Sequence, residues 1–142
     1  MIKISVCDDD EGQLTFFKQC FMEYNEKHEE KIEANFYQSV QSLLNEKKFS
    51  PDVYFLDIEL QDGNGLKLAG KIRTRNSKIP IVFITSHEEF MPEAFHVHAY
   101  QYLNEKKNAQ AVENVLNQLA DYFSEQNQIF SFQTYGEMIS LD

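Results

Sequence analysis

The sequence has little positive charge and no long apolar run, and each shortage excludes a class of protein. Its 142 residues carry 13 Lys and Arg against 23 Asp and Glu, so the formal net charge is −10. Binding to phosphates requires clustered cations, so this chain is not expected to bind nucleic acid by itself. No apolar run approaches the roughly 18 residues of a membrane span, so we expect no membrane contact.

Cysteine is also scarce, with Cys7 in a strand-like run and Cys20 in a helix-like run. The first residues, "MIKISVCDDD", contain neither a basic leader nor a long apolar segment, which predicts a protein that is not secreted. Thiols in such a chain are expected to be buried and reduced rather than joined in a disulfide. We therefore expect a cytoplasmic protein without a CxxC redox site.

What the sequence does contain is a regular alternation of short apolar runs with amphipathic stretches. Apolar runs of this length are typical of strands, and apolar residues three and four apart are typical of helices. The alternation predicts an α/β fold, a doubly wound five-stranded parallel sheet with helices on both faces. The expected strands are residues 2–7, 31–37, 52–59, 79–86 and 99–105, and the expected helices are residues 14–28, 40–47, 66–76, 88–96 and 109–126.

Residues 129–142, "IFSFQTYGEMISLD", depart from this scheme. They follow a polar "SEQNQ" joint and alternate like two strands around residues 135–137. They are expected to form either an added edge hairpin or the first strands of a second domain that is cut short, and we favour the second interpretation. The predicted division is one domain over residues 1–125 and a linker with the start of another over residues 126–142.

Polar residues follow the expected strands at the edge of the sheet where ligands bind. Three carboxylates that converge there would repel one another, so they require a cation. Oxygen ligands favour a hard ion, and Mg²⁺ is the one expected in a cytosol. The strand-end residues are Asp8 and Asp9 after the first strand, Asp57 after the third, Thr85 and Ser86 after the fourth, and Glu105 and Lys106 near the end of the fifth.

Asp57 closes the apolar run "VYFL", and burying a charge is costly unless something pairs with it. Beside a metal ion, its carboxylate could attack a phosphoryl group while the hydroxyl of Thr85 binds a phosphoryl oxygen. Plainer roles stay open. The acidic run 8–10 can cap the first helix, Asp57 can be a turn residue, and Thr85 can be a loop residue. The conjunction of three strand ends favours the phosphoryl site.

Together these residues resemble the receiver domain of bacterial two-component response regulators. The similar segments are "VCDDD", "FLDIELQDGNGL", "VFITS" and "AYQYL", in that order, over residues 1 to about 125. The resemblance implies a flavodoxin-like sheet with strand order 2-1-3-4-5 and a phosphoacceptor that is not an enzyme. Position by position, it implies that Asp57 is the phosphorylated residue and that Asp8 and Asp9 are the acidic pair, with Asp9 the direct Mg²⁺ ligand. The backbone carbonyl of Glu59 would complete the coordination of the ion. Thr85 would be the switch hydroxyl and Tyr102 the switch aromatic.

Two positions depart from the receiver pattern. Where the family has a lysine three residues after the aromatic, this sequence has Glu105, followed by Lys106 and Lys107. Either a local shift lets Lys106 reach the phosphoryl group, or the domain works without the lysine. A glutamate near an acyl phosphate would repel it. The loop after Asp57 also has Gln61 in place of the usual proline.

The resemblance implies partners as well. A sensor histidine kinase would donate the phosphoryl group, and a homodimer would form through the fourth helix, fifth strand and fifth helix of the pattern. The segment "FSFQTYGEMISLD" is similar to the start of a LytTR-type DNA-binding domain, which occurs in regulators of the accessory-gene and competence kind. DNA would then be bound only through a domain missing from this chain, and the output would be control of transcription.

The sequence also bears on three other functions. A receiver-like interaction module that is never phosphorylated agrees with Glu105. A phosphatase of the haloacid-dehalogenase type requires an early DxDx[TV] motif, whereas the candidate here is Asp57-Ile58-Glu59 in mid-chain. A flavodoxin relative would suffer repulsion between "DDDEG" and the flavin phosphate. The histidines are expected at surface or capping positions rather than as metal ligands, and they are His28, His87, His96 and His98.

Overall fold

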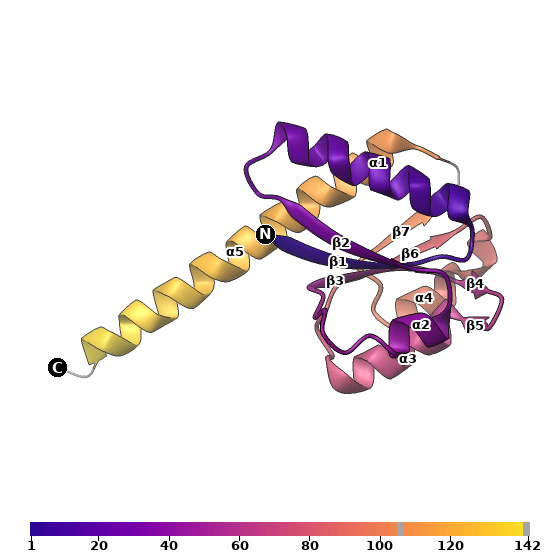
Figure 1. Ribbon diagram of the computed structural model, residues 1–142. Coiled ribbons are helices and arrows are strands. Elements are labelled where there is room, and N and C mark those ends of the chain that lie inside the picture. Colours follow the sequence, from indigo (N-terminus) through magenta and orange to yellow (C-terminus); the bar gives the residue numbers. More distant parts are fainter. Residues whose placement is uncertain (105–106, 141–142) are drawn as a thin grey trace.

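A parallel sheet of five strands forms the centre of the computed structural model, which describes residues 1–104 and 107–140. The strand order is β2-β1-β3-β6-β7, and every neighbouring pair is parallel (Figure 1). This is the order 2-1-3-4-5 in terms of the expected strands, so the predicted fold class is confirmed. The strands are β1 (Ile2–Cys7), β2 (Ile32–Tyr37), β3 (Val53–Asp57), β6 (Ile81–Thr85) and β7 (Gln101–Asn104).

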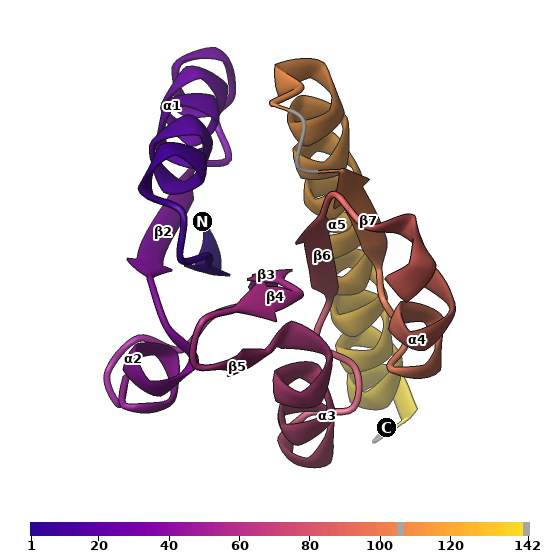
Figure 2. The same ribbon diagram turned by 90° about the vertical axis from the view of Figure 1, so that its right-hand side faces the viewer.

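Helices cover both faces of this sheet, which is why its inner strands are apolar on both sides. On one face α1 and α5 pack on the sheet, and the rings of Phe17 and Phe55 meet edge to face with centroids 5.8 Å apart. The other face carries α2, α3 and α4 around Leu56 and Phe83. Figures 1 and 2 show α1 and α3 on opposite sides of the strands. The helices are α1 (Glu11–Lys27), α2 (Val40–Leu44), α3 (Gly65–Arg75), α4 (Met91–His96, after a 3₁₀ turn at Glu88–Phe90) and α5 (Ala109–Ser140).

Local sequence signals account for where the helices begin. Asp10 is the N-cap of α1 and accepts a hydrogen bond from the amide of Gly12 at 2.9 Å. Ser39 caps α2 in a reciprocal pair with Ser42, as its position before the helix predicts. Pro92 lies in the first turn of α4, where its missing amide costs no helical hydrogen bond. Capping side chains therefore mark the starts of α1 and α2, and a proline in the first turn marks that of α4.

The C-terminal segment differs from the prediction. Two strands were expected within residues 129–142, but residues 129–140 continue α5, which ends at Ser140 and extends beyond the sheet in Figure 1. A lone hairpin is marginal in water, whereas extending an existing helix adds a hydrogen bond for each residue that it orders. Among the described residues, α5 included, we find no helix with the length and apolar character needed to cross a bilayer. The domain boundary near residue 125 stays a prediction.

A short antiparallel hairpin that the sequence did not predict joins β3 to α3. It pairs β4 (Glu59–Leu60) with β5 (Gly63–Asn64), and its turn carries Asp62. The Asp62 carboxylate accepts hydrogen bonds from the amides of Val40 and Gln41 at 2.9 and 3.1 Å. These bonds lower the pKa of Asp62. The hairpin is therefore tied to the first turn of α2.

Gly65 begins α3 directly against the end of β3. Its amide donates to the carbonyl of Ile58 at 2.8 Å. A Cβ atom at this position would lie 2.1 Å from the carbonyl oxygen of Asp57, which is far inside van der Waals contact. Glycine is required here because any side chain would displace the backbone that carries Asp57.

We expect Gly65→Ala to lower the free energy of unfolding by about 1–3 kcal/mol, since backbone atoms must move to relieve the overlap. Gly70→Ala is the matched control in the same helix, because a Cβ there has no neighbour within 4 Å. It should stabilise the protein by about 0.5–1 kcal/mol, the usual gain of alanine over glycine in a helix. Urea unfolding followed by circular dichroism measures both. Equal effects would show that the close approach at Gly65 does not constrain the fold.

Candidate functional site

Three carboxylates meet at the carboxyl end of the sheet. Asp8 follows β1 and Asp57 ends β3, and the two residues are only 1% and 3% exposed. Asp9, next to Asp8, is half-buried. One oxygen from each carboxylate lies within 4.8 Å of the other two. The structure thus brings together the three acidic residues that the strand-end argument selected, and we call them the acidic triad.

A backbone amide orients each member of the acidic triad. Such charge-assisted hydrogen bonds fix the direction of the carboxylate oxygens. The geometry is therefore set by the chain around the site and not only by the side chains. The three bonds run from Asp10 N to Asp8 Oδ1 (2.9 Å), from Gln61 N to Asp9 Oδ2 (2.9 Å) and from Glu59 N to Asp57 Oδ1 (3.3 Å).

The bond from Gln61 explains one departure from the receiver pattern. A proline at this position would have no N–H to donate. With glutamine, the turn of the β4–β5 hairpin provides a donor to Asp9 at 2.9 Å. The departure therefore adds a contact between the hairpin and the acidic triad.

The acidic run 8–10 divides between two roles. Asp10 caps α1 through its bond to Gly12, so the capping interpretation is correct for this residue. Asp8 and Asp9 belong instead to the acidic triad. Sequence alone does not separate the three, because the division depends on where the first helical turn begins.

Cys7 is the last residue of β1, and the negative charge of the site contributes to the pKa of its thiol. Burial, together with nearby negative charge, raises the pKa of its thiol to about 12. Both cysteines are buried and free, as expected from the sequence. Surrounding carboxylates add to the rise in the pKa of Cys7, and they are those of Asp62, Asp8, Asp57 and Asp9.

The donor set of the acidic triad suits a hard divalent cation. Carboxylate oxygens are the ligands that Mg²⁺ and Ca²⁺ take in proteins. Like charges held this close also disfavour one another's ionisation unless a cation offsets them. The carboxylate of Glu59 lies beside the imidazole of His87 and not in the acidic triad. The role of the Glu59 backbone carbonyl as a metal ligand stays a prediction.

Thr85 and Tyr102 both form hydrogen bonds with the backbone of His87, a residue that was expected only at a surface or capping position. Thr85 ends β6, is 1% exposed, and accepts a hydrogen bond from the His87 amide at 3.1 Å. Tyr102 lies on β7, and its hydroxyl donates to the His87 carbonyl at 2.5 Å. The two residues predicted to act as a switch are therefore connected through one peptide segment.

The imidazole of His87 lies between two carboxylates at the surface. Its Nε2 is 3.4 Å from Glu59 Oε2, and its Nδ1 is 3.2 Å from Glu89 Oε1. Glu59 lies two residues after the end of β3, and His87 lies two residues after the end of the neighbouring strand β6. This equal spacing is a signal in the sequence from which the contact between His87 and Glu59 could have been predicted.

Of the three residues that follow β7 in the lysine region, only Lys107 is described; Glu105 and Lys106 lie outside the described residues. The Nζ of Lys107 would be 3.5 Å from a Cβ placed on Gly12, which puts this ammonium at the start of α1. The predicted role of Lys106 stays a prediction.

Comparison with known proteins gives a consistent assignment. Residues 4–117 match the family described as the response regulator receiver domain. An uncharacterised response regulatory protein of Yersinia pestis is 29% identical over 120 residues, 84% of this chain and 49% of that protein. The sensory transduction protein LytR of Staphylococcus haemolyticus is 32% identical over 95 residues, 67% of this chain and 36% of that protein. The chain thus spans about half or less of the length of these relatives.

Solved receiver domains share the fold. The BeF3-activated receiver domain of DrrB matches with a TM-score of 0.71 and 20% identity, covering 85% of this chain and 98% of that one. The non-phosphorylated receiver domain of HemR from Leptospira biflexa matches with a TM-score of 0.70 and 20% identity, covering 83% and 93%. At this level of identity, the likeness concerns the fold alone.

The family match extends over most of the chain, and the fold and the acidic triad agree with it. Receiver domains are signalling modules that work with a kinase and are not enzymes in the usual sense. This chain belongs to the response regulator receiver domain family.

Proposed function

We propose that this domain accepts a phosphoryl group on Asp57 and that phosphorylation changes its protein contacts. The observation that carries the proposal is the acidic triad, with Asp57 buried at the end of β3 and two more carboxylates within 4.8 Å. Asp8, Asp9, Asp57 and the backbone carbonyl of Glu59 would hold Mg²⁺. Once bound, the ion would supply positive charge that offsets the carboxylates and an incoming phosphoryl group.

The residues around Asp57 then have distinct tasks. An oxygen of Asp57 would form a bond to phosphorus while the bond from phosphorus to the histidine of a sensor kinase breaks. The hydroxyl of Thr85 accepts from the His87 amide, so its own proton can be donated to a phosphoryl oxygen. Lys106 would place its ammonium on another phosphoryl oxygen.

Thr85 and Tyr102 would carry the change to the surface. A turn of the Thr85 hydroxyl toward the phosphoryl group would alter its bond to His87, whose carbonyl holds the Tyr102 hydroxyl. Tyr102 is on β7, in the face formed by α4, β7 and α5 that we propose for a homodimer. A local charge would in this way select between two packings of one segment.

The output is proposed to be transcription, through a LytTR-type domain of a longer protein that would lie beyond α5. The transcriptional regulatory protein LytR of Staphylococcus aureus supports this proposal, being 31% identical over 68 residues, 48% of this chain. This chain spans 28% of that relative, which leaves room for a further domain there. DNA would be bound by that domain, since the present chain has a net charge of −10.

A second candidate function is a receiver-like module that binds partners without being phosphorylated. Glu105 in the usual lysine position favours it, because a carboxylate near an acyl phosphate opposes its formation. The two functions differ in one measurable step, the covalent modification of Asp57.

Incubation with acetyl phosphate should give a single phosphoryl adduct that depends on both Mg²⁺ and Asp57, read as the intact mass. Asp57→Asn should give none. Asp10→Asn is the matched control, because it makes the same chemical change at the helix cap and should leave the adduct intact. A folded protein without an adduct under any condition would favour the unphosphorylated module.

Removal of Lys106 should slow the phosphorylation by about tenfold, the loss expected for about 1.4 kcal/mol of transition-state stabilisation. We expect Lys106→Ala to show this effect in the acetyl phosphate reaction. Lys107→Ala serves as the control, since that ammonium lies at the start of α1. Indistinguishable rates for the two variants would mean that the domain works without the lysine.

Beryllofluoride with Mg²⁺ should convert the protein to a dimer, measured by size-exclusion chromatography with light scattering. Phe95 on α4 is 68% exposed, and Met22 on α1 is 59% exposed. Phe95→Glu should prevent the dimer because it places a charge in the proposed interface, whereas Met22→Glu should not. Dimers of equal stability in both variants would place the interface elsewhere.

A further inference from the structure

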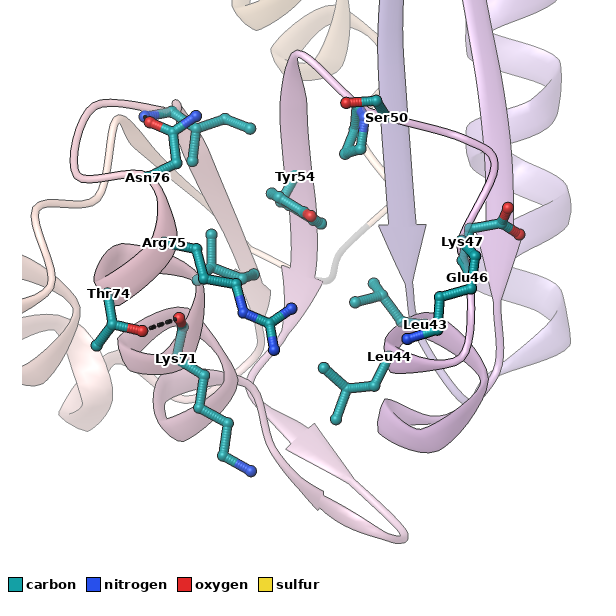
Figure 3. A pocket seen from close by; sticks show the side chains of 13 residues that line it. Leu43, Leu44, Glu46, Lys47, Ser50, Tyr54, Lys71, Thr74, Arg75 and Asn76 are labelled. Atoms are coloured by element: carbon teal, nitrogen blue, oxygen red, sulfur yellow. Dashed lines mark hydrogen bonds between the residues drawn. The ribbon is translucent and has the colours of Figure 1, made fainter.

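A groove between α2 and α3 lies at the start of β3, the strand whose other end carries Asp57. Its cavity volume is about 560 Å³, within the range of about 300–1,000 Å³ typical of small-molecule sites. Tyr54 of β3 lies between the two helices, as Figure 3 shows. The groove is therefore separate from the acidic triad.

Cations predominate among the charged residues that line the groove. Lys47 follows α2, and Lys71 and Arg75 come from α3. Figure 3 shows the Arg75 side chain reaching from α3 into the space between the helices. The one carboxylate in the lining, that of Glu46, is already bound by two backbone amides of its own loop at 3.0 and 2.9 Å. An excess of positive charge at this place contrasts with a chain whose net charge is −10.

None of these three cations is neutralised locally. Within the part of the chain that the structure describes, no ion pair joins Lys47, Lys71 or Arg75 to a carboxylate. The only hydrogen bond drawn in Figure 3 is that of the Thr74 hydroxyl to the backbone carbonyl of Lys71, at 2.7 Å. The ammonium and guanidinium groups are therefore available to a bound anion.

The lining of the groove also contains apolar side chains beside its polar and charged ones. Leu43 of α2 and Ile72 of α3 are buried side chains that face it from the two helices. Burial raises the pKa of the Tyr54 hydroxyl, whereas the charge of Arg75 acts in the opposite direction. The positive charge of Arg75 is therefore close enough to the Tyr54 hydroxyl to favour a negative charge there.

We propose that this groove binds a small organic anion, with an aromatic or branched apolar body and a carboxylate or phosphate group. The planar fork of Arg75 matches the two oxygens of such a group, and Lys47 and Lys71 add compact positive charge. The apolar body lies against Leu43 and Ile72, where burial from water drives its binding. A groove of about 560 Å³ between two helices has room for one small molecule of this kind.

The test is a titration of the whole chain, labelled with ¹⁵N, against four probes that share a naphthalene ring. The anions are 2-naphthoate and 2-naphthyl phosphate, the cation is 2-naphthylmethylamine, and the neutral probe is 2-naphthylmethanol. At least one anion should shift the amide signals of residues 43–47, 54 and 71–76 saturably, with a dissociation constant on the order of 1 mM. The cation should not bind there. The proposal is overturned by no saturable shift with either anion, or by equal binding of the amine.

Variants locate the site. Lys71→Ala combined with Arg75→Ala should weaken the anion at least about tenfold. Lys67→Ala is the matched control, an exposed lysine on the same helix that does not line the groove. Equal weakening by the control would assign the effect to general charge and refute the site. The titration uses neither Mg²⁺ nor a phosphodonor, so its result is independent of phosphorylation at Asp57.

Discussion

Repulsion among three carboxylates held within 4.8 Å of one another is the constraint on which the rest of this structure depends. Asp8 and Asp57 are neighbours because β1 and β3 pair in parallel, with Cys7 opposite Leu56 at their ends. The apolar core on both faces holds those strand ends side by side, which keeps the backbones of Asp8 and Asp57 close together. A cation bound there would offset this repulsion, so the donor set suits a ligand that brings positive charge.

The β4–β5 hairpin connects the acidic triad to the helices α2 and α3. Its turn holds Asp9 through the amide of Gln61 and holds the first turn of α2 through Asp62. Its end leads into Gly65, which rests against the carbonyl of Asp57. The two helices that it joins, α2 and α3, are also the walls of the cationic groove. The acidic triad and the groove are thus connected through the same hairpin and helices, although their charges are opposite in sign.

The sequence was sufficient for the sheet and the acidic triad, because both follow from where apolar runs stop. It was insufficient where the outcome depends on contacts distant in the chain. Lys47, Lys71 and Arg75 form no local pattern, so the groove is invisible until α2 and α3 are placed. The alternation in residues 129–140 fits strands, yet alternation cannot determine whether partner strands exist. Without such partners in the described chain, helix propagation from α5 prevails.

Glu105 is best judged by the size of the energies involved. A like charge 4 Å away costs about 1 kcal/mol in water and about 4 kcal/mol at an effective dielectric constant of 20. The first value slows a reaction by only about fivefold, and the second by about a thousandfold. A glutamate in contact with solvent would thus modulate phosphorylation, and only a desolvated one would prevent it. Whether the domain is a phosphorylated switch or an unmodified binding module therefore depends on the dielectric surroundings of one side chain and not on its identity alone.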